Sequence, residues 1–213
     1  MILLIDKQKG WTSADVVAVV KKTLHEKTGH GGTLDPNATG LLIIGTGVDT
    51  KSLGVITKNT TKTYEAEVFL GETRDTEDIE GKITSKNDQI IPTIDQVSIV
   101  IKSFTGEIEQ IPPTFSAIKL HGKKAYELAR KGIEQKMEPR KVTIYKIDLI
   151  SYKYPVLKIS CEVSSGTYIR SLARDIGEKL GTGAYLNELR RTRVGEYLVQ
   201  KAISLSELQK QQR

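Results

Sequence analysis

The sequence predicts an α+β protein. Helix and strand patterns alternate irregularly along its 213 residues, and several strands follow one another, which favours this class over a doubly wound sheet. Residues 142–150 and 157–163 illustrate the point, because both have strand patterns and no helix is predicted between them. With 38% apolar and 27% charged residues, a chain of this length can bury a sizeable core, as one elaborate domain or two small ones.

The first predicted elements surround a loop that is rich in glycine and threonine. Residues 2–5 predict a short strand, and Ser13 is predicted to be the N-cap of a helix with apolar residues between positions 16 and 24. Residues 29–40 predict a loop. Residues 41–44 predict a brief apolar strand that ends at glycines.

The later elements include two strands with a clear alternation. Residues 64–70 alternate, with Tyr64 on the row of Ala66, Val68 and Leu70. In residues 157–163, Cys161 shares the apolar face and is therefore predicted to be a buried core residue. The other predicted elements are helices at residues 94–104, 125–130 and 167–180, a strand at residues 142–150, and a weak helix at residues 205–212.

The charge pattern permits a polyanionic partner. The chain has a net charge of +6, and residues 119–141 carry eight basic against three acidic residues, a net +5. Tyr126 lies among these charges, as stacking residues of RNA-binding segments do. A solvated charged face explains the same pattern.

Several classes of protein are disfavoured. The apolar start is too short for a signal peptide, and no stretch approaches the roughly 20 apolar residues that cross a bilayer. The single Cys161 cannot form an internal disulfide, and the three scattered histidines lack metal-ligand spacing. The acidic stretch 72–80 lacks the spacing of a calcium loop, so a solvated loop or one that organises the rim of an active site is expected. We therefore expect a cytoplasmic protein without membrane contact or a structural metal.

Residues 29–42, Gly-His-Gly-Gly-Thr-Leu-Asp-Pro-Asn-Ala-Thr-Gly-Leu-Leu, hold the candidate chemistry. Their glycines permit positive φ and a close approach of a ligand to the backbone, and Pro36 biases Asp35 toward an extended conformation. Asp35 could equally be the N-cap of a helix with Pro36 at its first position. A phosphate-binding loop is disfavoured because no Gly-Lys-Ser/Thr follows.

This segment resembles the active-site motif of the TruB family of tRNA pseudouridine synthases, G-H-x-G-x-L-D-P-x-A-x-G-x-L. Two positions elsewhere depart from the family pattern, Gln8 in place of proline and Arg74 in place of threonine. Further matches follow in the family's order along nearly the whole chain, at residues 5–13, 62–64, 71–81, 112–130, 165–170 and 189–193.

The resemblance implies a pseudouridine synthase fold, a mixed and mostly antiparallel sheet flanked by helices. It implies one catalytic domain over residues 1–213, with an RNA-gripping insertion at about 105–141 and no C-terminal module of the PUA type. The implied reaction converts uridine 55 in the T-loop of tRNA to pseudouridine. That reaction neither oxidises nor adds anything, so it needs no redox cofactor and no metal.

The resemblance also implies roles for single residues. Asp35 is the catalytic carboxylate, although the sequence leaves open whether it attacks the sugar, attacks the base or removes a sugar proton. Arg170 supplies the cation that keeps it ionised, and Tyr64 packs against the uracil and assists proton transfer. His30 lies beside the extruded uridine, Leu189 lines the pocket and Lys7 supports the substrate.

Each of these side chains has a plainer alternative. Arg170 could cover the sheet, Tyr64 could be an inward-facing strand aromatic, and Leu189 could be a core leucine. His30 could be a polar loop residue and Lys7 a surface lysine.

RNA binding is expected to involve two basic groups, and the resemblance assigns the first of them to the T-arm of tRNA. The alternatives are a guide-RNA-dependent catalytic subunit and a non-catalytic protein that binds or folds RNA. We expect a monomer without an obligate protein partner. The first basic group contains Lys123, Lys124, Arg130 and Lys131, and the second contains Arg190, Arg191 and Arg193.

Overall fold

The chain forms two compact units in a computed structural model that describes residues 1–87, 89–116, 118–120, 123–125, 128, 135 and 137–211. No helix in these ranges is long and apolar enough to cross a membrane. Because each unit is assembled from separated stretches, no single position in the sequence divides them. Unit 1 comprises Met1–Glu65, Glu162–Ser165 and Glu188–Arg213, and unit 2 comprises Ala66–Cys161 and Gly166–Asn187.

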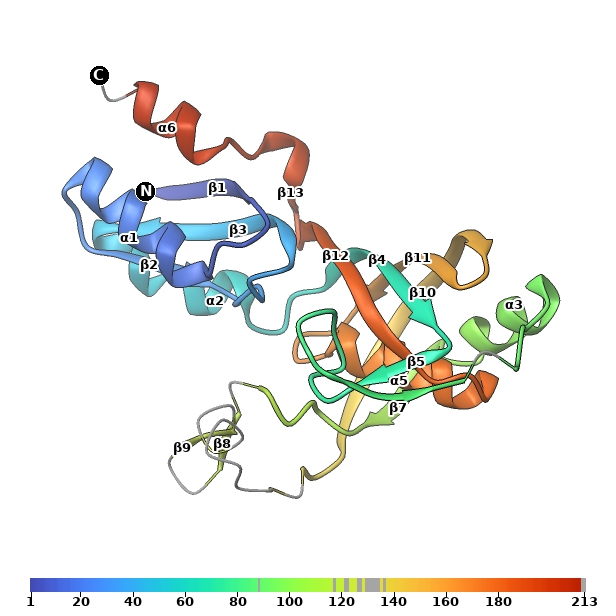
Figure 1. Cartoon of the computed structure of the whole chain (residues 1–213). Coiled ribbons are helices and arrows are strands. Elements are labelled where there is room, and N and C mark those ends of the chain that lie inside the picture. Colours follow the sequence, from blue (N-terminus) through green and yellow to red (C-terminus); the bar gives the residue numbers. More distant parts are fainter. Residues whose placement is uncertain are drawn as a thin grey trace. The chain divides into compact units, whose positions relative to one another are not determined.

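The centre of unit 1 is strand β3 (Thr39–Thr46), which is buried along almost its whole length. Strand β1 (Ile2–Lys7) and strand β2 (Thr28–Gly31) both pair with it antiparallel (Figure 1). The last part of strand β12 (Ala184–Val194) pairs with the start of β3 in parallel, with Arg191 opposite Gly40. The hydrophobic cluster of this unit contains Leu41, Ile43, Leu53, Val194 and Val199.

Helix α1 (Ser13–Leu24) packs on β2 and β3, and its N-cap corrects the sequence prediction. The cap is Thr12, whose side chain accepts a hydrogen bond from the Asp15 N–H in a reciprocal capping box, while the expected cap Ser13 is the first helical residue. The other short elements of unit 1 are η1 (Gly47–Lys51), α2 (Leu53–Thr57), β13 (Tyr197–Leu198), η2 (Val199–Lys201) and α6 (Leu205–Gln211).

The glycine-rich segment is less of a loop than expected, because its ends belong to β2 and β3. Of Gly29, Gly31 and Gly32, only Gly32 has a positive φ, +74°. A Cβ added at Gly31 would lie 2.5 Å from the Thr57 methyl carbon, so glycine there lets β2 approach α2 closely. Gly31 therefore serves strand packing, and Gly32 is the glycine of the three that serves loop conformation.

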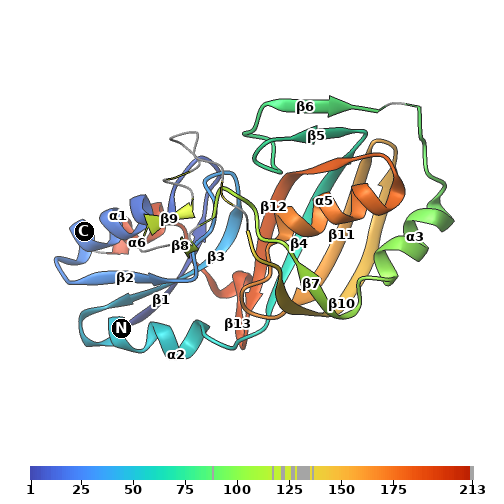
Figure 2. The ribbon, with the colours of Figure 1, turned by 90° about the horizontal axis from the view of Figure 1, so that it is seen from below.

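In unit 2 the neighbouring strands follow the order β12, β4, β11, β10, β7. Helix α5 (Ile169–Leu180) and helix α3 (Ile94–Lys102) pack against each other, and α3 also packs on β10. In Figure 2, α5 lies in front of these strands and α3 lies beside them. Cys161 is 1% exposed, so its predicted place in the core is confirmed. The strands are β4 (Lys62–Leu70), β7 (Gly106–Gln110), β10 (Arg140–Lys153) and β11 (Val156–Val163).

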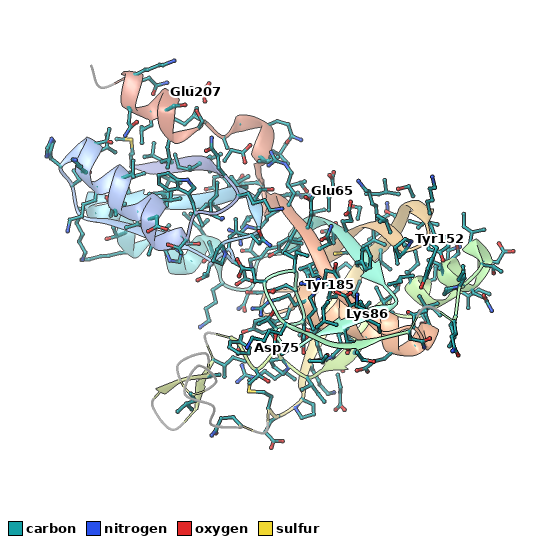
Figure 3. The ribbon with its side chains drawn as sticks, viewed as in Figure 1. Glu65, Asp75, Lys86, Tyr152, Tyr185 and Glu207 are labelled. Atoms are coloured by element: carbon teal, nitrogen blue, oxygen red, sulfur yellow. The ribbon has the colours of Figure 1, made fainter. Side chains whose placement is uncertain are left out.

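A second ladder in unit 2 follows β4. Strand β5 (Glu72–Arg74) pairs antiparallel with β6 (Ile83–Lys86), and a tight turn at residues 75–81 joins them. Arg74, a departure from the family pattern, pairs with Glu72 at 2.7 Å and lies 4.4 Å above the ring of Tyr185. Asp75, Lys86 and Tyr185 are labelled around this ladder in Figure 3.

The α+β class and the mostly antiparallel pairing agree with the prediction, as do the strands over 64–70, 142–150 and 157–163 and the helices near 94–104 and 167–180. The predicted helix over 125–130 lies largely outside the described residues. Residues 111–139 connect β7 to β10, and these strands pair antiparallel with Gln110 opposite Arg140. The connection therefore begins and ends at neighbouring positions of the sheet.

Candidate active site

Asp35 lies in a turn between β2 and β3 of unit 1. Its carbonyl oxygen accepts a hydrogen bond from the Ala38 N–H at 3.0 Å, which places Pro36 and Asn37 at the centre of the turn. No helix begins here, so Asp35 is not a helix N-cap. Leu34 and Ala38 are 3% and 2% exposed, whereas Asp35 between them is only partly buried. Apolar anchors thus flank the carboxylate on both sides.

The ammonium of Lys7 fixes the turn from the end of β1. Lys7 is 1% exposed, and its Nζ donates to the carbonyl oxygens of Pro36 at 3.1 Å and of Trp11 at 2.6 Å. The Gly10 N–H donates to the same Pro36 oxygen at 2.9 Å. Lys7 is therefore no surface lysine, and the support that it gives acts on the backbone beside Asp35. Its expected contact with substrate stays a prediction.

The hydroxyl of Ser13 holds the residue before Asp35. Ser13 is 2% exposed, and its Oγ accepts from the Leu34 N–H at 2.9 Å and donates to the Leu34 carbonyl oxygen at 3.0 Å. Both backbone groups of Leu34 are thereby satisfied away from water. The first residue of α1 is thus bonded to the Asp35 segment.

Arg191 holds the two ends of the segment. Its Nε donates to the Leu41 carbonyl oxygen at 2.8 Å and its Nη2 to the Gly32 carbonyl oxygen at 3.0 Å. At Gly40, with φ +98°, an added Cβ would lie 2.3 Å from the carbonyl oxygen of Arg191, so only glycine fits beside this strand.

These contacts correct the expected second basic group. Arg191 is 1% exposed and bonded to backbone, so it is not an RNA-facing cation. Arg190 pairs with Asp6 through two hydrogen bonds at 2.7 and 3.1 Å, which neutralises its charge. Only Arg193 is an exposed member, and its Nε donates to the carbonyl oxygen of Gly195.

Two further basic side chains lie near the guanidinium of Arg191. His30 of β2 is half-buried, its buried Nδ1 has no hydrogen-bond partner within the described ranges, and burial together with the Arg191 charge lowers its pKa. Lys62 donates to the carbonyl oxygens of Thr57 and Thr60, each at 3.2 Å. Burial and the Arg191 charge lower the pKa of Lys62 to about 8. Because the pKa of His30 is lowered, its imidazole is favoured in the neutral form.

Tyr64 and Leu189 occupy strand positions in unit 1. Tyr64 is 7% exposed and faces inward on the row predicted from its alternation. Leu189 is partly buried, and its carbonyl oxygen accepts from the Thr39 hydroxyl at 3.4 Å. These positions suit both a pocket-lining role and an ordinary packing role, so the expected contacts of both residues with uracil stay predictions.

Arg170 is the second residue of α5 in unit 2 and is 6% exposed. Its guanidinium donates to the carbonyl oxygens of Phe115 at 2.9 Å and of Thr76 at 3.2 Å, and its Nε lies 3.7 Å from Asp78 Oδ2. The acidic turn is therefore not a solvated loop, since Asp78 is 8% exposed and faces an arginine. Asp35 belongs to unit 1, and the expected influence of Arg170 on its ionisation stays a prediction.

The first basic group is only partly described. Lys123 and Lys124 form strand β9 (Lys123–Lys124), which pairs antiparallel with β8 (Lys119–Leu120). Their side chains, and the whole of Arg130 and Lys131, lie outside the described residues. Their contacts with RNA stay predictions.

Known proteins resemble the chain over nearly its full length. A family model described as TruB family pseudouridylate synthase (N terminal domain) matches residues 21–169. The chain belongs to the TruB family. A second model, tRNA pseudouridylate synthase B C-terminal domain, matches residues 170–213 of this TruB-family chain.

Two similar relatives are both called tRNA pseudouridine synthase B. The protein from Protochlamydia amoebophila (strain UWE25) is 45% identical over 208 residues, which cover 97% of this chain and 79% of the relative. The protein from Endomicrobium trichonymphae is 45% identical over 203 residues, covering 95% and 88%. Among solved structures, a chain of a Cbf5-Nop10-Gar1 complex aligns with a TM-score of 0.77 and 33% identity over 98% of this chain. This TruB-family chain spans 53% of that longer chain.

Sequence reasoning missed how Ser13 and Arg191 hold the TruB-family aspartate. One signal was available for the helix cap, because Thr12-Ser13-Ala14-Asp15 has capping-box spacing from Thr12 and not from Ser13. Lys7 also had a signal, since it lies two residues after buried Ile5 on the same face of β1. For Arg191 the arginine-rich run suggested only charge, and its burial follows from the pairing of β12 with β3.

Proposed function

We propose that this chain is a tRNA pseudouridine synthase that isomerises uridine 55 of the T-loop, with Asp35 as its catalytic carboxylate. The observation that carries the proposal is the Asp35 turn itself. Lys7, Ser13 and Arg191, all at most 2% exposed, donate to the backbone on both sides of Asp35. A catalytic group needs such a rigid frame, because its position must not relax when substrate binds. The names of the two relatives support the substrate.

The chemistry asks for one ionised carboxylate and little else. The bond between uracil N1 and the ribose C1′ breaks, the base turns, and a bond from C5 to C1′ forms. C5 then loses its proton, and N1 gains one. Asp35 would assist the first step as a nucleophile or a base, and it is regenerated at the end. We assign to Tyr64 and Leu189 contacts with the uracil and to His30 a place beside the extruded nucleotide. Arg170 would supply the cation of the site. The lowered pKa of His30 supports a neutral imidazole in that role.

The experiment that tests the reaction uses unmodified tRNA transcript and maps pseudouridine at nucleotide resolution. Asp35→Asn should abolish product at position 55 while tRNA affinity stays within a few fold, because the change removes a charge and no bulk. Asp95→Asn, at an exposed position of α3, is the matched control and should behave as the unmodified sequence does. Equal turnover by Asp35→Asn and the unaltered chain would reject the proposed role.

Arg170 is tested in the same assay. Arg170→Ala should lower turnover more than it lowers tRNA affinity, because the side chain is buried and its proposed partner is the catalytic group. A larger loss of affinity than of turnover would make Arg170 a phosphate contact.

RNA binding is assigned to the connection between β7 and β10, within the insertion expected at about 105–141 of a single catalytic domain. Residues 119–141 carry +5 of the chain's net +6, and contacts between such cations and phosphates weaken steeply with salt. Replacing Lys123, Lys124 and Lys131 by alanine should flatten the dependence of log Kd on log salt. A control with three exposed lysines of unit 1, Lys21, Lys22 and Lys27, should keep the slope. Equal slopes in both triple variants would place the RNA elsewhere.

The resemblance to a Cbf5-Nop10-Gar1 complex makes a second function worth testing, namely catalysis within an assembly of RNA and protein. The transcript assay separates the two, because a stand-alone enzyme modifies tRNA without added RNA or protein. Inactivity on transcript alone would favour the assembly. A monomeric state, no obligate protein partner and a cytoplasmic location go with the stand-alone proposal as further predictions.

A further inference from the structure

Glu77 occupies an unusual position in the turn between β5 and β6. Its φ is +63°, a left-handed conformation that residues with a side chain seldom adopt. Its N–H donates to the Arg74 carbonyl oxygen at 3.0 Å, and its own carbonyl oxygen accepts from the Leu186 N–H at 2.9 Å. The side chain is 15% exposed. Such a conformation persists when surrounding contacts offset its energetic cost.

The carboxylate of Glu77 supplies those contacts on helix α5. One oxygen is hydrogen-bonded to Nη1 of Arg174, and the other lies 3.1 Å from the hydroxyl of Ser171. Burial raises the pKa of the Glu77 carboxyl, while Arg174 acts in the opposite direction. The two partners stand one helical turn apart from each other on α5 and flank the same carboxylate.

Both partners of Glu77 also contact Ile111, the first residue after β7. Arg174 Nη2 donates to the Ile111 carbonyl oxygen at 3.1 Å, and the Ser171 hydroxyl lies 2.8 Å from that oxygen. The single hydroxyl proton serves one acceptor at a time, so Ser171 donates either to Glu77 or to Ile111, whereas Arg174 donates to both through separate N–H groups. These contacts join the acidic turn, helix α5 and the start of the 111–139 connection at one place.

Arg170 lies in the same arrangement, one turn before Arg174 on α5. It donates to Thr76, the neighbour of Glu77, and to Phe115, four residues beyond Ile111. The two arginines thus donate into the same two segments, and displacement of either segment would move the acceptors of Arg170.

Charge balance alone does not explain Glu77. Arg174 also pairs with Asp175 at 2.7 Å, and its Nε lies 3.9 Å from the exposed carboxylate of Glu178. The arginine would keep carboxylate partners without Glu77. Of Glu77, Asp175 and Glu178, only Glu77 links α5 to the turn that contains Thr76 and Asp78.

We infer that Glu77 is a positioning residue for the proposed reaction, holding Arg174 and Ser171 so that the carbonyl oxygens of Thr76 and Phe115 keep Arg170 in place. The inference rests on the proposed function. It assigns Glu77 no contact with RNA. It therefore predicts an effect on the rate of the chemical step and little effect on tRNA affinity.

The test is Glu77→Gln in the full chain, with Glu178→Gln as the matched control that removes another carboxylate from Arg174. Single-turnover rates and tRNA Kd are measured well below the unfolding temperature of each variant. Glu77→Gln should lower the rate at least about tenfold, since small displacements of a catalytic constellation are costly, and change Kd less than threefold. Glu178→Gln should stay within twofold in both. Equal rates in the two variants, or a loss confined to Kd, would overturn the inference.

A double-mutant cycle tests whether Glu77 acts through Arg174. If Glu77 acts through Arg174, then Glu77→Gln combined with Arg174→Gln should be no slower than the slower single variant. If the rate losses of the two single variants multiply in the double variant, the residues act independently and the inference is rejected. If circular dichroism shows that Glu77→Gln is unfolded, Ser171→Ala combined with Arg174→Gln is compared in the same way. Asp35→Asn separates the two proposals. Only the positioning role is refuted if the unaltered chain is active, Asp35→Asn is inactive and the Glu77 and Glu178 variants have equal rates. The proposed function is refuted if the unaltered chain is inactive.

Discussion

Thr12 and Ser13 are adjacent hydroxyl residues with different contacts, and replacing each by alanine separates helix capping from the holding of the Asp35 turn. Thr12 accepts the Asp15 N–H as the cap of α1. Ser13 instead bonds both backbone groups of Leu34, next to Asp35. The two substitutions remove similar atoms one residue apart, so each is the control for the other.

The magnitude follows from burial. In Ser13→Ala the N–H and carbonyl of Leu34 lose a partner in a place where Ser13 is 2% exposed and Leu34 3%. An unsatisfied buried group costs about 1–3 kcal/mol, so with two such groups the free energy of unfolding should fall by about 2–6 kcal/mol. Loss of an exposed threonine cap costs about 1 kcal/mol, which sets the expectation for Thr12→Ala.

The assay combines urea unfolding at 25 °C with kcat on saturating tRNA transcript. Ser13→Ala should lower kcat about tenfold or more, because an unanchored turn no longer presents its carboxylate in one geometry, whereas Thr12→Ala should stay within twofold. If Ser13→Ala loses stability and keeps the parental kcat, the turn does not need this anchor for catalysis. If it loses no more stability than Thr12→Ala, the buried-group argument is wrong.

Three further predictions concern stability and reactivity. Gly40→Ala should lower the free energy of unfolding in urea by about 2–5 kcal/mol, more than Gly106→Ala does. Both glycines have a positive φ, but only at Gly40 does a backbone atom lie 2.3 Å from the position of an added Cβ. Equal losses in the two variants would mean that backbone conformation is the whole explanation. The lowered pKa of His30 means that the folded chain binds fewer protons than the unfolded chain below pH 6.5, so the free energy of unfolding should fall with acidification there. In His30→Gln the free energy of unfolding should depend less steeply on pH in that range. Parallel curves of unfolding free energy against pH for the two proteins would contradict this prediction. Burial raises the pKa of Cys161 to about 12, so a thiol reagent at pH 8 should label it only as the chain unfolds in urea, and rapid labelling without urea would show an accessible thiolate.

The sequence alone determined the elements whose side chains repeat with a clear period. The alternation in 64–70 and 157–163 placed Tyr64 and Cys161 on buried rows, and α3 and α5 formed near their predicted ranges. The motif at 29–42 also led to the family, since a run of fourteen positions needs no folded structure to be compared. These properties are local, because strand and helix periodicity depends only on neighbouring residues.

The tertiary structure decided which groups hold Asp35 and Arg170. Ser13 bonds Leu34, 21 positions away, and Arg191 bonds Leu41, 150 positions away. Whether a lysine or arginine meets solvent or a buried carbonyl depends on strand register and on the approach of separate segments, which no local pattern encodes. For that reason Lys7 and Arg191 are charged residues typical of a surface, although both are buried and bonded to the backbone. The acidic turn likewise has the composition of a solvated loop, although it faces two arginines.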